Sequence, residues 1–238
     1  MVRKNLEKNI CIVIPAFNEE VTIGNVITGL KKYFKKASYQ YEIVVVNDGS
    51  KDHTRDVAKK QGATVIDHIL NTGAGGATAT GLSYAGQNGF DIAVTLDADG
   101  QHSAEDVLKG IHLSLSTKTD LLVGSRLINS KGMSKVKVIG NMGLSLITRI
   151  LFGINVTDSQ SGLRIFSRKA LEQLRWETSG YEFCSEMLWR AKQMKLVIDE
   201  YPIEAIYTEY SRSKGQNNWN AVNIVKSLIK RRLTEMFE

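Results

Sequence analysis

The stretch IAVTLDADGQH, residues 92–102, decides how this chain is expected to fold. It opens with an apolar run typical of a strand that is buried on both faces of a sheet. Asp97 and Asp99 follow where the run ends, and two like charges so close together call for a compensating cation. Gln101 can add a further oxygen ligand, so we expect a magnesium or manganese site here. A solvated, Asp-rich turn is the alternative.

Other apolar runs alternate with helical patterns along the chain. The runs are Ile10–Ile14, Glu42–Val46, Ala63–Ile66 and Asp120–Val123. Strands that alternate with helices form βαβ units, in which helices cover a parallel sheet. The expected fold is therefore α/β, with a Rossmann-like, mostly parallel central sheet flanked by helices in a single domain.

Capping residues mark the expected starts of two helices. After the first run, apolar residues recur at helical spacing from Ile23 to Phe34, and Asn18 can cap that helix. Ser50 can cap the helix after the second run in the same way. Both residues also lie in polar clusters directly after strands, where parallel sheets bind their ligands.

Candidate nucleotide contacts lie in three segments of the first half. Residues 15–19 open a helix, whose backbone N–H groups suit anions, although they could form only a turn. Asp48 ends the second strand and can accept hydrogen bonds from a ribose or a base, but its surroundings are also good turn chemistry. Gly73 and Gly75 lie in NTGAGGA, residues 71–77, where glycine allows a close backbone approach to a ligand. A purely structural turn is equally compatible with that segment.

Basic residues of the second half are candidate phosphate ligands, with a solvated surface charge as the alternative for each. Guanidinium groups suit bidentate phosphate binding. Arg126 and Arg164 each lie in a short polar segment beside a strand-like run. The whole set is Arg126, Lys137, Arg164, Arg212 and Lys214.

The composition excludes several classes of protein. A hydrophobic content of 42% argues against a disordered or fibrous chain. Cys11 and Cys184 lack the paired spacing of a zinc site or a redox motif. A net charge of +6 favours anionic partners. No apolar run reaches the roughly 20 residues that span a bilayer, and the N-terminus does not resemble a signal peptide, so we expect a cytoplasmic protein.

Two helical stretches could lie on a membrane surface. Residues 140–152 have an apolar side with Leu144, Ile147, Ile150 and Leu151, and Trp219 to Phe237 mixes apolar with basic residues. The alternative for both is a core-facing helix with a basic outer face.

Taken in order, these motifs resemble glycosyltransferase family two, and within it the polyprenyl-phosphate glycosyltransferases of the dolichyl-phosphate mannose and glucose synthase group. The resemblance covers about residues 9–216. It rests on VIPAFNEE (13–20), EIVVVNDGS (42–50), LDADGQH (96–102), VGSR (123–126) and DSQSGLRIF (158–166).

The resemblance implies a GT-A fold, a nucleotide-diphosphate sugar donor, Mg2+ or Mn2+, and inversion at the anomeric carbon by single displacement. We expect the catalytic domain to span residues 1–216 and a basic amphipathic helix to span 217–238. The donor would contact Pro15, Ala16, Asn18, Glu19, Asp48, Gly73, Gly75, Asp97 and, in a closing loop with Ser213, Lys214. The metal would be held by Asp97, Asp99 and Gln101, and the acceptor phosphate by Arg126, Lys137, Arg164 and Arg212. The catalytic residues would be Asp99, Arg126 and Glu186.

The expected activity is transfer of a hexose or N-acetylhexosamine from a UDP- or GDP-sugar to a polyprenyl (dolichyl) phosphate. It would take place at the cytoplasmic face of the membrane, with the protein bound peripherally and with no nucleic-acid partner. An anionic phosphate needs no strong base, whereas the alternative of a sugar or glycan acceptor would require Glu186 as general base. A non-catalytic module that binds nucleotide or anionic lipid is the alternative from another class.

Overall fold

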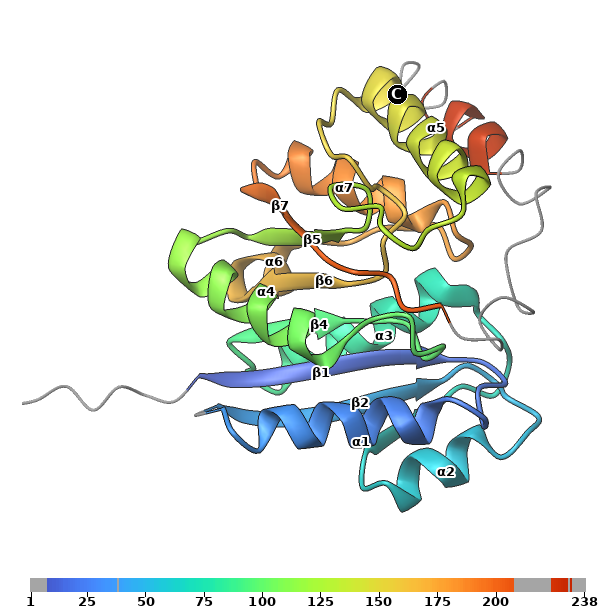
Figure 1. Ribbon diagram of the computed structural model, residues 1–238, viewed down its shortest axis with the longest axis vertical. Helices are drawn as coiled ribbons and strands as arrows, with labels where there is room; N and C mark the ends of the chain where they lie inside the picture. Colours follow the sequence, from blue (N-terminus) through green and yellow to red (C-terminus); the bar gives the residue numbers. More distant parts are fainter. Residues whose placement is uncertain (1–7, 38, 208–223, 231, 233–238) are drawn as a thin grey trace, which may run out of the picture.

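The computed structural model of the chain describes residues 8–37, 39–207, 224–230 and 232. Its strands form one sheet in the order β3-β2-β1-β4-β6-β5-β7 (Figure 1). All neighbouring strands pair in parallel except β6, which is antiparallel to both β4 and β5. The strands are β1 (Asn9–Ala16), β2 (Gln40–Asn47), β3 (Thr64–Asp67), β4 (Ile92–Thr95), β5 (Leu121–Ser125), β6 (Arg164–Ser167) and β7 (Ile198–Pro202).

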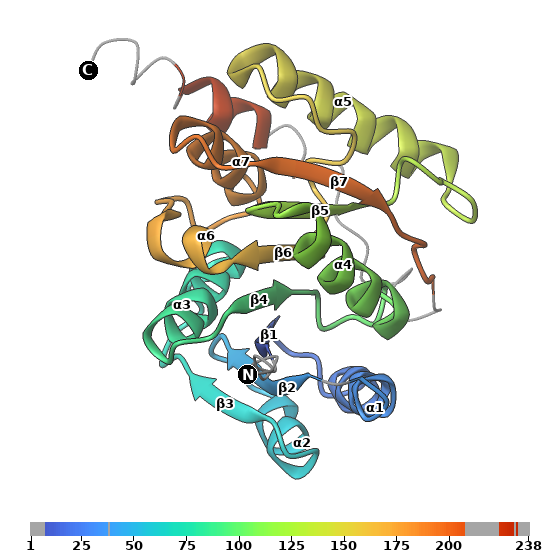
Figure 2. The ribbon, with the colours of Figure 1, turned by 90° about the vertical axis from the view of Figure 1, so that its left-hand side faces the viewer.

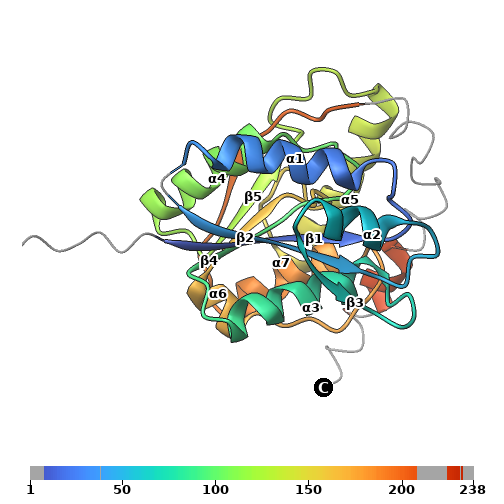
Figure 3. The same ribbon diagram turned by 90° about the horizontal axis from the view of Figure 1, so that it is seen from below.

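Helices cover both faces of the sheet, as the alternating pattern predicted. In Figure 3, α1 and α4 lie on one face, with α3, α6 and α7 on the other. Figure 2 shows α5 beyond the β7 edge of the sheet, beside α7. The helices are α1 (Ile23–Phe34), α2 (Thr54–Lys60), α3 (Gly73–Gln87), α4 (Ala104–Thr117), α5 (Lys135–Phe152), α6 (Arg168–Gln173) and α7 (Phe183–Gln193).

The central strand β1 shows why the runs are apolar at every position. Its isoleucines at 10, 12 and 14 pack in the core cluster that contains α1 and α4. Cys11 and Val13, which alternate with them, pack in the cluster that contains α3 and α7. All five side chains are fully buried, so each face of the strand lies in its own core.

The predictions of Asn18 and Ser50 as helix caps are wrong. α1 begins after Thr22 and α2 begins after His53, so neither Asn18 nor Ser50 caps a helix. Asn18 instead adopts a left-handed conformation with φ of 54°. Its side chain accepts a hydrogen bond from the Lys51 N–H at 2.9 Å, and its own N–H donates to the Ser50 hydroxyl at 3.0 Å. The polar groups therefore tie the two strand-to-helix loops to each other, because both loops lie at the same edge of the sheet.

The order of the strands reverses at β1. From β1 the chain passes outward to β2 and β3, and then returns to place β4 on the other side of β1. In such sheets the crevice beyond the carboxyl ends at the reversal point is the usual ligand site. Asp97 and Asp99 follow β4, and Pro15 and Ala16 end β1, so all of them lie at the edge of the sheet where such a site is expected.

Part of the expected C-terminal helix lies within the described residues. Residues 224–230 are helical, and Ile224 and Leu228 are buried in the same core cluster as α3 and α7. Lys226 and Lys230 are exposed. In this part of the chain the helix presents its apolar face to the core and a basic face outward.

Candidate active site

The two carboxylates of the DADGQ segment lie side by side at the end of β4. The Asp97 side chain accepts a hydrogen bond from His102 Nε2 at 3.3 Å. Because a carboxylate only accepts, Nε2 of His102 donates this hydrogen bond. Asp99 accepts hydrogen bonds from the Gln101 backbone N–H at 3.0 Å and from the Gln101 side-chain amide.

The surroundings shift the pKa values of the two carboxylates in opposite directions. Burial and the neighbouring charge of Asp97 raise the pKa of Asp99 above its usual range. Burial also acts to raise the pKa of Asp97, but the hydrogen bond and charge of His102, with the more distant charge of Arg126, hold it below its usual range. One carboxylate is thus held ionised while its neighbour resists ionisation.

A divalent cation fits this donor set. Asp97, Asp99 and the amide of Gln101 offer oxygen ligands, which Mg2+ and Mn2+ prefer, and a cation would relieve the repulsion between the carboxylates. Within the described residues, no group of three or more His, Cys, Asp and Glu side chains could hold a metal. Few ligands from the protein are typical of sites that complete their coordination with water and substrate phosphate.

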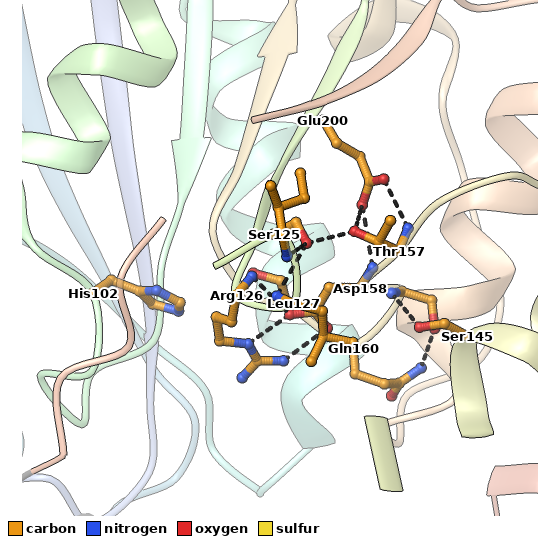
Figure 4. Close-up of polar contacts among 12 residues, drawn as sticks. His102, Ser125, Arg126, Leu127, Ser145, Thr157, Asp158, Gln160 and Glu200 are labelled. Carbon is orange, nitrogen blue, oxygen red and sulfur yellow. Dashed lines mark hydrogen bonds and ion pairs between the residues drawn. The ribbon is translucent and has the colours of Figure 1, made fainter. Parts of the chain in front are cut away.

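Arg126 follows β5 and is fixed by a buried carboxylate. Its Nε and Nη2 donate to the two oxygens of Asp158 at 2.7 and 3.0 Å (Figure 4). The Asp158 side chain is fully buried, and 14% of the Arg126 side chain is exposed. This bidentate pair holds the guanidinium in one orientation at the end of β5.

Asp158 is in turn held by β7. Glu200 accepts hydrogen bonds from the backbone N–H groups of Thr157 at 2.7 Å and Asp158 at 3.2 Å (Figure 4). The Thr157 hydroxyl lies 2.6 Å from that of Ser125, which precedes Arg126. Sequence reasoning did not single out Asp158 or Glu200 as site residues, since neither follows a run of strand-forming residues. Only the packing of β5 against β7 brings them to Arg126.

Arg164 differs from Arg126, because its side chain is buried within the protein. The residue is 1% exposed, and its guanidinium donates to the backbone carbonyls of Ser161, Ser159 and Cys184 at 3.0, 2.8 and 3.1 Å. The group therefore faces the loop before β6 and the start of α7, whereas an acceptor phosphate was the expected contact.

Asp48 closes the loop before α3. It is 3% exposed, and it accepts hydrogen bonds from the Thr72 N–H at 2.9 Å, the Thr72 hydroxyl at 2.8 Å and the Gly73 N–H at 2.9 Å. His68 Nδ1 lies 2.7 Å from the same carboxylate. The carboxylate expected to bind a nucleoside thus organises the glycine-rich segment around itself.

The glycines of that segment allow two backbones to meet. Gly73 has a φ of +85°, and a Cβ added at Gly75 would lie 2.5 Å from the Thr178 carbonyl oxygen and 2.9 Å from Phe183 Cβ. The Gly75 N–H donates to the Ser179 carbonyl at 2.8 Å. Glycine is needed here for close contact with the loop at 178–179.

Glu186 holds the other side of this contact. It is 1% exposed and accepts hydrogen bonds from the backbone N–H groups of Glu177 and Thr178 at 3.0 and 2.9 Å, and from the Thr178 hydroxyl at 2.6 Å. A general base needs a lone pair directed at its substrate. These contacts use both oxygens of Glu186 to fix the loop that packs on α3.

Of the remaining expected residues, the structure describes Glu19 and Lys137. The Glu19 N–H donates to the Thr54 hydroxyl at 2.7 Å, which fixes the loop after β1. Lys137, near the start of α5, places its ammonium 4.6 Å from the centre of the Tyr207 ring. Arg212, Ser213 and Lys214 lie outside the described residues.

Known proteins have sequences similar to this chain. Residues 11–175 match the family described as glycosyl transferase family 2. The chain is 44% identical over 236 residues to the UDP-N-acetylglucosamine–dolichyl-phosphate N-acetylglucosaminyltransferase of Methanococcus voltae, a match that covers 89% of this chain and 91% of the relative. It is 30% identical over 214 residues to the undecaprenyl-phosphate mannosyltransferase of Micrococcus luteus, which covers 85% of each.

Solved structures show the same fold at low sequence identity. Mannosyl-3-phosphoglycerate synthase from Rubrobacter xylanophilus superposes with a TM-score of 0.74 at 18% identity, over 96% of this chain and 75% of that chain. Glucosyl-3-phosphoglycerate synthase from Mycobacterium tuberculosis, in complex with Mn2+, UDP and glucosyl-3-phosphoglycerate, superposes with a TM-score of 0.71 at 21% identity, over 93% and 77%. These likenesses confirm the expected α/β fold.

Proposed function

The chain belongs to glycosyltransferase family 2, and on that premise we propose that it transfers a sugar from a nucleotide-diphosphate donor to a polyprenyl phosphate with inversion. We infer that UDP-N-acetylglucosamine is the first donor to test, because the Methanococcus voltae relative carries that name. The observation that carries the proposal is that the Asp97 and Asp99 carboxylates lie within reach of the charge of Arg126, which Asp158 holds in place.

The described residues divide the work at this site. Asp97, Asp99 and Gln101 would hold Mg2+ or Mn2+, which when bound would neutralise the charge that develops on the departing nucleoside diphosphate. Arg126 and Lys137 would bind the acceptor phosphate, whose oxygen is already anionic and attacks the anomeric carbon without a strong base. This agrees with Glu186, the only candidate base in the expected set, being engaged in holding a loop.

A thermal-shift panel with UDP, GDP and their sugars tests the donor. With Mn2+ present, UDP-N-acetylglucosamine at about 100 times its Kd is expected to stabilise the folded protein by about 2.7 kcal/mol. For a chain of this size that corresponds to a rise in Tm of roughly 5–10 °C. Labelled sugar should then appear in the lipid phase when polyprenyl phosphate is added. No shift with any nucleotide would contradict the proposal.

The same assay separates the alternatives. Transfer to an oligosaccharide, but not to polyprenyl phosphate, would favour a glycan acceptor. Nucleotide binding with neither transfer nor hydrolysis would favour a module that only binds. A Glu186→Gln variant could not decide between acceptors alone, because an amide cannot accept from both backbone N–H groups of the 177–178 loop.

The outer face of α5 supports peripheral contact with a membrane. Within the described residues, no helix is long and apolar enough to cross a bilayer. Leu144, which was expected on the membrane side, is buried in the core, whereas Ile150 is 72% exposed. A stripe of exposed apolar side chains runs along the helix. It consists of Val136, Ile139, Met142, Leu146 and Ile150.

We propose that this α5 stripe lies in the interface of the membrane that carries the lipid acceptor, on the cytoplasmic face. An amphipathic helix of this kind buries its apolar side at the boundary between headgroups and acyl chains. Lys135 and Arg149, which are exposed on α5, would meet anionic headgroups.

Replacing two residues of the α5 stripe tests the membrane contact. Ile139→Ser with Ile150→Ser removes roughly 1 kcal/mol or more of apolar burial per site, so vesicle affinity should fall at least about tenfold. Co-sedimentation with phosphatidylglycerol vesicles measures it. Val197→Ser, which changes an apolar side chain 54% exposed near β7, is the matched control. Undiminished vesicle binding by the double variant would exclude α5 as the contact.

A further inference from the structure

We propose that Arg164 is a positioning residue, which holds the turn at residues 159–162 against Asp97 and so sets where that carboxylate stands in the site. The inference rests on the proposed function, since it assigns Asp97 to metal binding. It gives the buried arginine a part that does not involve the acceptor.

The Arg164 guanidinium fixes the turn through hydrogen bonds to its backbone carbonyls. Its Nε and Nη2 donate to the carbonyls of Ser161 and Ser159 at 3.0 and 2.8 Å, and its Nη1 donates to the Cys184 carbonyl at 3.1 Å. No carboxylate in the described ranges forms an ion pair with it. A guanidinium directs its N–H groups in a rigid fork. Because Arg164 donates both to the turn and to Cys184 of α7, it holds the turn at a fixed distance from α7.

The turn carries a glycine that touches Asp97 on its other side. A Cβ added at Gly162 would lie 2.5 Å from Asp97 Oδ2 and 2.6 Å from its Cγ. The Gly162 carbonyl accepts a hydrogen bond from the Thr95 hydroxyl at 2.9 Å, which locks the turn to the end of β4. Any movement of Gly162 is therefore passed directly to the carboxylate.

Apart from Arg164 and Thr95, side chains of α5 and α7 hold the first half of the turn. The Ser159 N–H donates to the Ser145 hydroxyl of α5 at 2.9 Å, and Gln160 Nε2 donates to the Ser185 hydroxyl of α7 at 3.1 Å. In the second half, next to Gly162, the Arg164 side chain donates to the Ser161 carbonyl. Loss of the Arg164 side chain should therefore let the backbone at Gly162, which lies against Asp97, move more freely.

Binding of Mn2+ in the presence of UDP, measured by loss of the free-ion EPR signal, tests this without any transfer reaction. Residues that orient metal ligands typically change metal affinity by about 10-fold to 100-fold when they are replaced. We expect that loss for Arg164→Met and for Gly162→Ala. Arg164→Lys should fall between them and the parent, because an ammonium keeps the charge but lacks the fork.

Two matched variants control for the substitutions themselves. Arg168→Met removes an arginine that pairs with Glu172 on the surface of α6. Gly29→Ala adds a methyl where nothing lies within 4 Å. Both should bind Mn2+ within about twofold of the parent, the effect of an ordinary surface change.

The outcomes separate this inference from the proposed function. Parental Mn2+ affinity in folded Gly162→Ala and Arg164→Lys proteins would overturn the positioning role alone. Failure of the parent protein to retain Mn2+ with UDP would overturn both. If Arg164→Met does not fold, the other two variants decide, because the three atoms nearest to a methyl at Gly162 all belong to the short Asp97 side chain.

Discussion

Asp99→Asn is expected to abolish sugar transfer while leaving the protein folded. If the carboxylate helps to hold the cation, its loss should cost about 4 kcal/mol of transition-state stabilisation, or roughly a 1000-fold decrease in kcat. The fold should not suffer, since burial and the charge of Asp97 raise the pKa of Asp99. A carboxylate whose pKa is raised on folding destabilises the folded state above that pKa, so the neutral amide should keep or raise Tm near neutral pH.

The measurement is initial transfer rate beside a thermal melt. Asp91→Asn is the matched control, because Asp91 lies just before the opposite end of β4 and pairs with Lys8 in an exposed ion pair. That variant should retain nearly parental turnover. If folded Asp97→Asn and Asp99→Asn proteins both turn over as fast as the parent, the catalytic assignment of the pair is wrong.

Asp158→Ala is expected to produce the largest loss of stability. The substitution leaves the Arg126 guanidinium largely buried without its bidentate partner. Removing one member of a buried ion pair typically costs about 3–5 kcal/mol of unfolding free energy. Transfer should also weaken through a higher KM for the lipid phosphate, because Arg126 would no longer be held in one orientation.

Urea unfolding measures the first effect, with a matched pair on the surface for comparison. Arg168 and Glu172 also meet at 2.7 Å, but both side chains are exposed, so Glu172→Ala should cost no more than about 1 kcal/mol. The double variant Arg126→Met with Asp158→Ala should recover part of the loss, since no unpaired charge remains. Equal costs for Asp158→Ala and Glu172→Ala would mean that burial does not strengthen the Arg126 pair.

The first half of the fold could be predicted because its central strands, β1, β2 and β4, are largely buried on both faces. Each is a nearly continuous apolar run, and β4 carries the two carboxylates out at its end. β6 was recognised only as a strand-like run beside Arg164, and β7 was not predicted. β6 contains a charged residue that happens to be buried, and β7 reads IDEYP, which has no clear period. Their place beside β5 follows from tertiary packing.

The site could be predicted at the level of segments, but not of side-chain direction. Arg126 and Arg164 both lie in short polar segments, and nothing local says that the first is partly exposed and the second faces inward. The same holds for Asp48, which binds its own glycine-rich loop. Sequence identifies which residues reach the edge of the sheet where the site is expected, whereas only the packed structure shows which of their atoms remain available.

The place of β6 also has a consequence for how the protein emerges from the ribosome. β4 pairs on one side with β1, but its other neighbour begins only at Arg164. At about 5–20 residues per second, translation leaves that edge of β4 without its partner for several seconds. Three of its four residues, Ile92, Ala93 and Val94, are apolar, which makes such an open edge a template for pairing with other nascent chains. β6 is synthesised after β4 and β5 and pairs with both, so it joins β5 and β7 to the part of the sheet that is synthesised first.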